Sequence, residues 1–109
     1  MGIGGLYNKS ITVKRETASM DAQGSTTRSW STLGIIRGRA RPASARERMA
    51  ASRYGAEISH IVYCGPEEDV HRGDRMEAGS LVLTVVAVRD PGGMGHHLEV
   101  DAMEIQHGT

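Results

Sequence analysis

The segment Leu81–Arg89 constrains the fold of this chain more than any other part of the sequence. It reads LVLTVVAVR, an almost unbroken run of Val and Leu. Such a run predicts a central β-strand that is buried on both faces. It is also far too short to span a membrane, so we expect no membrane partner.

Four other segments alternate apolar and polar residues with the period of a half-buried strand. The second of them contains Gly34 and Gly38, near which we expect it to bend. The segment 18–28 is poor in large apolar side chains and rich in Ser, Thr, Asp and Gly, so we expect a mobile loop there. Turns are expected around residues 73–74 and 90–95. The four predicted strands span residues 10–17, 30–41, 57–64 and 97–103.

One helix is predicted between the second and third of these segments. Pro42 ends the preceding strand, and Ser44 with Glu47 forms the S-x-x-E pattern of a capping box. The helix should run from about residue 45 to 54, with Gly55 as its C-terminal left-handed residue. Its apolar side chains are small, so we expect it to lie on a rim or against another subunit.

These elements predict a mainly β fold: a small β-barrel or sandwich of about five to six antiparallel strands, with one short helical insertion at about 43–55. The 109 residues are expected to form a single domain, 1–109. The chain is 39% apolar and has no Phe, so its core should be aliphatic and thin, and packing against sister subunits would help it. Cys64 is the only cysteine, which excludes an internal disulfide.

The net charge of zero conceals two oppositely charged halves. Residues 1–53 contain ten Lys or Arg and three acids, giving +7, whereas residues 54–109 contain three Arg and ten acids, giving −7. The halves could simply form two solvated faces of one domain. Alternatively, a basic face meets nucleic acid or an acidic partner, and opposite faces of neighbouring subunits attract in a head-to-tail ring.

Six arginines between residues 37 and 53 are the strongest functional signal. On a strand, Arg37, Arg39 and Arg41 share one face. On the helix, Arg46 and Arg53 lie seven residues apart and therefore on one side. Two such ridges suit contact with phosphates without reading bases, although a solvated helix face with intersubunit salt bridges explains them as well. The run has no aromatic residue to stack on bases, which disfavours single-strand binding.

No residues suggest catalysis, a metal site or a cofactor. None of the acids forms a pair suited to general acid–base chemistry, and the five His lack the spacing of a metal site. We therefore expect a protein that is not an enzyme and holds no cofactor.

The order of these signals resembles the tailed-phage head–tail joining family, also called stopper, head-closure or head–tail adaptor proteins. The likeness includes Ile3-Gly4 with Leu6, followed by the strand Ile11-Thr12-Val13-Lys14-Arg15. Asp21 and Gly24 before Trp30 then resemble the family's first hairpin. The likeness continues with Ala40-Arg41-Pro42-Ala43-Ser44-Ala45-Arg46-Glu47, similar to the stretch that opens the family's helical insertion. The later strands match in 58–63, Gly73-Asp74-Arg75, Leu83, Val85, Val88, Leu98 and Val100. Ala45, where the family often has Gly, and Tyr63-Cys64, where it often has Arg-Tyr, depart from the pattern.

This resemblance implies a structural virion protein at the head–tail junction, assembled in the host cytoplasm. Such proteins form a ring, six- or twelve-fold, that closes the DNA exit channel after packaging and gives the tail its docking surface. The implied partners are copies of this chain, portal or adaptor proteins, tail terminator or tail tube, and packaged double-stranded DNA. The insertion would face the channel, which places Arg46, Arg48, Met49 and Arg53 there. The strand residues Arg37, Arg39 and Arg41 would contact DNA or a neighbouring subunit.

Two other functions fit the sequence. A tail terminator or tail completion protein is also a small β-rich ring former. A free-standing duplex nucleic-acid-binding barrel of the SH3 or OB type would use the arginines, although it lacks an aromatic platform.

Overall fold

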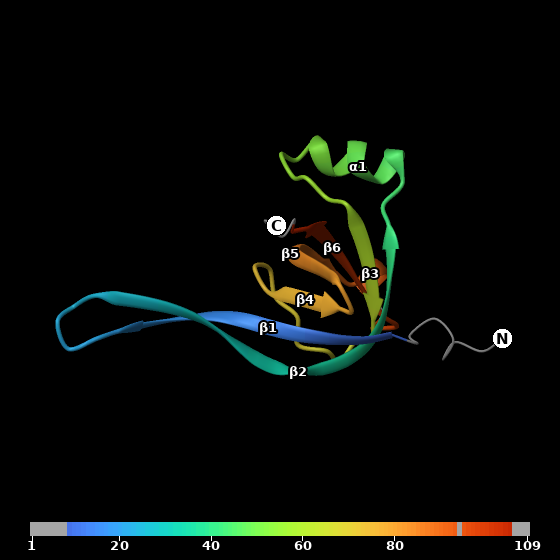
Figure 1. Cartoon of the computed structure of the whole chain (residues 1–109). Coiled ribbons are helices and arrows are strands. Elements are labelled where there is room, and N and C mark those ends of the chain that lie inside the picture. The colour runs from blue at the N-terminus through green and yellow to red at the C-terminus, as the bar shows by residue number, and fades with distance from the viewer. Residues whose placement is uncertain (1–8, 94, 106–109) are drawn as a thin grey trace.

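The computed structural model describes residues 9–93 and 95–105 of the chain. Within them, six antiparallel strands close into a barrel in the order β1-β2-β3-β6-β5-β4, and α1 stands at one end (Figure 1). The prediction of a small β-barrel with one inserted helix is therefore confirmed, and the sandwich alternative is not adopted. The elements are β1 (Lys9–Met20), β2 (Thr26–Pro42), α1 (Ala45–Ser52), β3 (His60–Cys64), β4 (Arg75–Ala78), β5 (Leu81–Arg89), the 3-10 helix η2 (Pro91–Gly93) and β6 (Leu98–Glu104).

Strand β4 closes the barrel, and the sequence did not predict it. This four-residue strand pairs on one side with β5 and on the other with residues 12–14 of β1. Its sequence, RMEA, has only one large apolar residue, so nothing in its pattern separates it from the preceding turn. The strand exists because its two neighbours in the barrel supply its hydrogen bonds.

The barrel interior is filled by small aliphatic side chains, as the composition predicted. None of the described aromatic residues is fully buried. Strand β5 contributes Leu83 and Val85, but a register shift between Val85 and Ala87 interrupts its alternation, and its last residues are half-exposed. The expectation that the whole of β5 is buried on both faces was therefore wrong. The main cluster comprises Ile11, Val13, Val62, Cys64, Val70, Met76, Leu83, Val85, Val100 and Ala102.

The predicted mobile loop at 18–28 was wrong, because most of it forms a hairpin. β1 continues to Met20 and β2 begins at Thr26, and the two pair in register along this whole length. Asp21 closes the turn: its Oδ1 accepts the backbone N–H groups of Gln23 at 2.9 Å and Ser25 at 2.8 Å, while Gly24 has a φ of +86°. Ordered backbone hydrogen bonds and a capped turn replace the missing apolar side chains.

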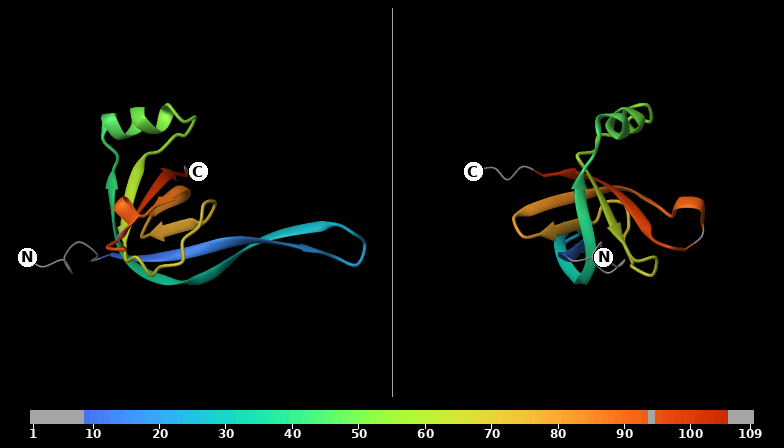
Figure 2. Two further views of the ribbon diagram at one scale, coloured as in Figure 1. Left: turned by 180° about the vertical axis from the view of Figure 1, so that it is seen from behind. Right: turned by 90° about the vertical axis from the view of Figure 1, so that its right-hand side faces the viewer.

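We define the arm as residues 15–31, the part of the hairpin that extends beyond the barrel (Figures 1 and 2). It makes the molecule elongated, with extents of 55 × 34 × 30 Å. The radius of gyration is 15.3 Å, whereas a compact domain of this length would have about 13 Å. Residues 16–31 are all exposed, so the arm adds nothing to the core of its own chain.

The helix begins as predicted and ends slightly earlier than predicted. The Ser44 hydroxyl accepts the Glu47 N–H at 3.1 Å, and the Glu47 carboxylate accepts the Ser44 N–H at 2.8 Å, which is a complete capping box. The helix ends at Ser52 rather than Tyr54, and Gly55 has the expected positive φ of +74°. Similarly, β3 begins at His60 rather than at residue 57.

Candidate nucleic-acid interface

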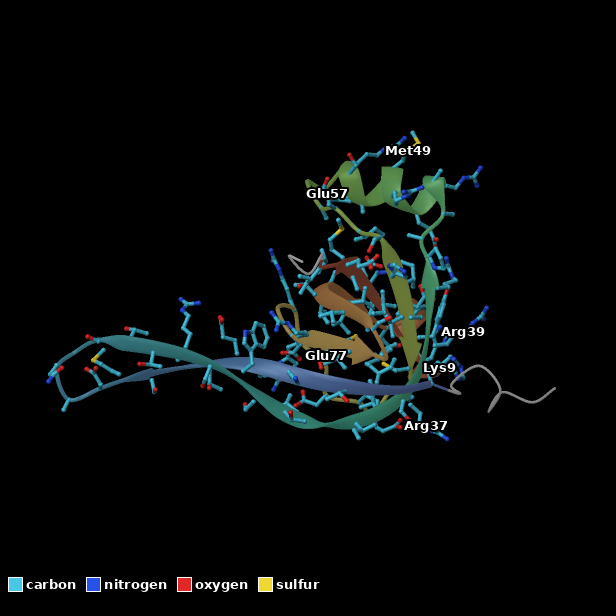
Figure 3. All side chains as sticks on the ribbon, in the orientation of Figure 1. Lys9, Arg37, Arg39, Met49, Glu57 and Glu77 are labelled. Carbon is cyan, nitrogen blue, oxygen red and sulfur yellow. The ribbon has the colours of Figure 1, made fainter. Side chains whose placement is uncertain are left out.

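Helix α1 lies outside the barrel and has no buried residue. Beneath it lies a small apolar cluster of Ala43, Ile58 and Ile61, against which Ala51 packs. Three arginines of the candidate site, Arg46, Arg48 and Arg53, are exposed on or next to the helix. Met49 is 63% exposed and points away from the barrel (Figure 3). The helix therefore carries exposed arginines on a segment that packs only lightly against the rest of its own chain.

Two of these arginines share one side of the helix. Arg46, Met49, Ala50 and Arg53 line a single open hollow of about 320 Å³. No ion pair to Arg46, Arg48 or Arg53 is found within residues 9–93 and 95–105. Guanidinium groups that lack an acidic neighbour are able to receive phosphate oxygens from outside the molecule.

The three strand arginines have different surroundings. Arg37 and Arg39 are exposed, and Figure 3 shows both on the side of the barrel that carries Lys9. Arg37 donates a hydrogen bond to the Ser10 hydroxyl at 3.1 Å. Arg41, in contrast, is half-buried and bound within its own chain. The strand ridge therefore presents two available cations rather than three.

Arg41 connects β2, β3 and α1. Its Nη atoms donate to the two carboxylate oxygens of Glu47 at 2.8 and 2.6 Å, and its Nε and Nη2 donate to the Tyr63 hydroxyl at 3.1 and 2.8 Å. The hydrogen bonds from Arg41 and from the Ser44 backbone lower the pKa of Glu47 to about 2. We call this set of contacts the latch, because it joins the first turn of α1 to the barrel. The sequence predicted Glu47 as a cap but gave no signal for its pairing with Arg41 or Tyr63.

A shallow groove of about 290 Å³ separates α1 from the barrel beside the latch. Ile58 and Ile61 contribute apolar surface to it, and Arg89 and Asp101 contribute charged groups that bind each other at 2.6 Å. Because the groove is open and small, the helix is only partly supported from below. This leaves the latch and Ala51 as its main attachments.

Some of the charge of the two sequence halves is neutralised inside one chain. Lys14 pairs with Glu77 at 3.2 Å, and Arg15 pairs with Asp74 at 2.9 Å. These bridges join the first half to the second across the β1–β4 side of the barrel. The basic groups left on the surface are then concentrated on α1 and on the outer face of β2.

The described residues contain no group of three or more His, Cys, Asp or Glu side chains that could hold a metal ion. Cys64 is completely buried, and burial raises the pKa of its thiol to about 11, which keeps it protonated and unreactive. No helix in the described part of the chain is long and apolar enough to cross a membrane.

Comparison with solved structures supports the fold. The chain is similar to protein SF1141 from Shigella flexneri 2a, with 17% identity, 95% of this chain and 96% of that chain covered, and a TM-score of 0.78. It is also similar to a chain from the virion of a native gene transfer agent particle, with 18% identity, 91% and 96% covered, and a TM-score of 0.57. No curated protein matches the sequence.

The sequence also matches a family model. The model describes the phage head completion protein, and the match covers residues 4–105, which is nearly the whole chain. This confirms the resemblance to phage head–tail joining proteins that the motifs indicated. The chain belongs to the phage head completion protein family and is a structural component of a phage virion.

Proposed function

We propose that this protein is the stopper of the phage neck. Copies of the chain form a ring, six- or twelve-fold, at the head–tail junction after assembly in the host cytoplasm. The ring closes the DNA exit channel once packaging is complete and offers the tail its docking surface. Portal or adaptor proteins lie on the head side, and the tail terminator or tail tube lies on the other. The role is mechanical and involves no catalysis.

The observation that carries this proposal is the display of Arg46, Arg48 and Arg53 on a helix with no buried residue. A ring that faced these groups inward would surround the channel with guanidinium groups. Packaged DNA carries about one negative charge per 1.7 Å of its axis, so such a ring would hold it without regard to sequence. Met49 lies between Arg46 and Arg53 and would contact the DNA or the same helix of a neighbouring copy.

The weak attachment of α1 supports a channel that opens when the tail docks. The helix is joined to the barrel chiefly by the latch and by Ala51. A partner that displaced Arg41 from Glu47 would free the helix while leaving the barrel core intact, because Ile11, Val62 and their neighbours lie elsewhere. A small change at the docking surface would then move a whole segment.

The test is a particle assay with Arg46, Arg48 and Arg53 all replaced by Ala. We expect particles that lose packaged DNA or fail to join tails, although electron microscopy still finds the chain in the neck. The same three arginines replaced by Lys should restore DNA retention, since charge rather than shape holds the DNA. Arg72→Ala serves as a control, because Arg72 is an exposed arginine in the β3–β4 loop. Normal DNA retention by the triple Ala variant would reject the channel role.

Copurification separates the stopper from a tail completion protein. A stopper should bind head-side connectors before any tail is present, whereas a tail completion protein should bind tails in the absence of heads. Binding to duplex DNA as a monomer, with a steep salt dependence, would instead favour a free-standing nucleic-acid-binding barrel.

A further inference from the structure

The arm has two strand edges with which no other strand of the described residues pairs. β1 pairs with β4 only through residues 12–14, so its outer edge is free from Arg15 to Met20. β2 first pairs with β3 at Gly38, so its outer edge is free from Thr26 to Arg37. Each free edge presents a row of backbone N–H and C=O groups.

The free edge of β2 lacks the usual protection against pairing with another chain. Residues 29–36, SWSTLGII, contain no charged residue and no proline. Trp30, Leu33 and Ile35 on this edge are 38%, 46% and 69% exposed. A bulge at Leu33 is the one feature of this segment that would hinder pairing with another chain. The residues on either side of it have the composition of a strand that pairs readily with another strand. Such an edge is expected to be covered in the assembled state.

A hollow lies beside the barrel end of this edge. It has a volume of about 390 Å³ and lies between Leu33, Ile35 and the loop that follows β3, which contributes Glu68 and Asp69. The loop runs past the free edge of β2 without forming a strand with it. Residues 9–93 and 95–105 therefore leave this side of β2 open.

The register gives the arm two different faces, because cross-strand partners point to the same side of a sheet. One face carries Glu16 opposite Trp30, Ala18 opposite Arg28, and Met20 opposite Thr26. Apart from Arg15, the other face consists entirely of hydroxyl side chains. These are Thr17, Ser19, Thr27, Ser29 and Ser31.

We propose that the free β1 edge of one copy pairs with the free β2 edge of the next copy, forming an antiparallel sheet that continues from subunit to subunit. The contact joins two different surfaces of the same chain, so it is heterologous and is able to close into a ring. It resembles the addition of a strand to an exposed sheet edge. The inference names the interface of the ring in the proposed function and in that respect rests on it.

Charge complementarity supports a second copy as the occupant. Within one arm, Arg28 already binds Glu16 at 3.0 Å. In the proposed sheet, the hydroxyl faces of neighbouring copies would lie on the same side. Glu16 of one copy and Arg28 of the next would then both lie on the opposite side. Each Glu16 would then lie between two arginines, and each Arg28 between two glutamates.

The base of the arm is fixed, which prepares the two edges for pairing. Arg15 donates two hydrogen bonds of 2.9 Å to the buried carboxylate of Asp74, and the Arg75 guanidinium lies 4.2 Å from the centre of the Trp30 ring. These contacts hold the arm in one direction relative to the barrel. Less conformational entropy is then lost when the arms associate.

Disulfide trapping between variants that each carry one added cysteine tests the pairing. Thr17→Cys is co-expressed in the phage-producing host with Thr27→Cys, Ser29→Cys or Ser31→Cys, each in a separate experiment, and purified particles are oxidised. All four positions lie on the hydroxyl face, so at least one combination should give a covalent dimer of the two variants. Cys64 does not compete, because it is fully buried. Thr17→Cys with Ser52→Cys, an exposed position on α1, should give no dimer.

The outcomes separate this inference from the proposed function. Absence of a mixed dimer in particles that carry the ring would reject the edge pairing and leave the stopper role intact. Dimers formed mainly by Thr17→Cys alone would indicate a twofold contact and would also reject it. Mixed dimers in particles where the chain lies outside the neck would support the pairing and reject the stopper role.

A charge introduced on the free edge gives an independent measurement. Arg28→Glu should reduce the yield of tailed particles at least tenfold, because it would place a carboxylate beside Glu16 of the next copy. Met103→Glu is the matched control, since Met103 is exposed on the barrel away from the arm. Both variants should remain folded, which circular dichroism checks. Equal yields from the two variants would overturn the inference.

Discussion

The guanidinium of Arg41 binds both carboxylate oxygens of Glu47, at 2.8 and 2.6 Å, and so joins the end of strand β2 to the first turn of helix α1. Two-pronged pairs of this kind fix orientation as well as distance. Glu47 also caps the helix through the Ser44 N–H. One side chain therefore starts the helix and attaches it to the barrel.

We expect Glu47→Gln to loosen α1 without unfolding the barrel. The amide keeps an oxygen for the Ser44 N–H but loses the ionic bond to Arg41, at a cost of about 1 kcal/mol for a partly exposed pair. Hydrogen exchange of residues 45–52 should accelerate, while exchange in β3 and β6 stays unchanged. Equal exchange of α1 in both proteins would show that the latch does not hold the helix.

The same latch predicts a pH dependence. The pKa of Glu47 is lowered from 4.5 to about 2 in the folded chain. Its contribution to stability is therefore complete above about pH 4.5 and is lost as the pH falls toward 2. Hydrogen exchange of α1 should accelerate over that range in the native protein, and the Glu47→Gln variant should lack this step.

Asp74→Ala should destabilise the whole domain. Asp74 is 2% exposed and accepts hydrogen bonds from Arg15 and from the His71 N–H. Burial alone would raise the pKa of Asp74, but these hydrogen bonds and the charge of Arg15 outweigh it and lower the pKa. Removal leaves Arg15 without its buried partner, so we expect a loss of about 3 kcal/mol in urea unfolding. Asp69→Ala, at a 68% exposed side chain, should change stability by less than about 0.5 kcal/mol.

Gly38→Ala should lower the stability of the domain, whereas Gly34→Ala should not. A Cβ at Gly38 would lie 2.7 Å from the Tyr63 carbonyl oxygen and 2.9 Å from Cδ1 of Ile11, and the backbone oxygen has no room to move because β2 pairs with β3 there. We expect a loss of about 2 kcal/mol in urea unfolding. Nothing lies within 4 Å of a Cβ at Gly34, so the same change four residues earlier in β2 should be nearly neutral. Equal stability of the two variants would contradict the close contact at Gly38.

Shortening the arm should leave the barrel stable. Residues 18–28 can be replaced by Asn-Gly, which joins the cross-strand partners Thr17 and Ser29 through a two-residue hairpin turn. All the removed residues are exposed, so the free energy of unfolding should change by less than about 0.5 kcal/mol. A large loss of stability in urea would show that the arm supports the fold of a single chain.

Local sequence patterns determined much of this protein. Alternating residues located most of β1, β2, β3 and β6, the Val-rich run located β5, and Ser44 with Glu47 located the start of α1. Each of these signals is carried by residues close together in the chain, because strand period and helix capping are local properties. The arginines of α1 were visible for the same reason.

Only the tertiary structure showed that the arm is an ordered hairpin, that β4 closes the barrel, and which groups bind Arg15 and Arg41. The arm has no apolar period, and its order comes from cross-strand hydrogen bonds and the turn at Asp21. Strand β4 pairs with the adjacent strand β5 and also with β1, which is distant in sequence, and Arg15 meets Asp74 only after the barrel closes. Pairing between distant segments depends on register and closure of the whole sheet, and neither property is present in the composition or period of a short segment.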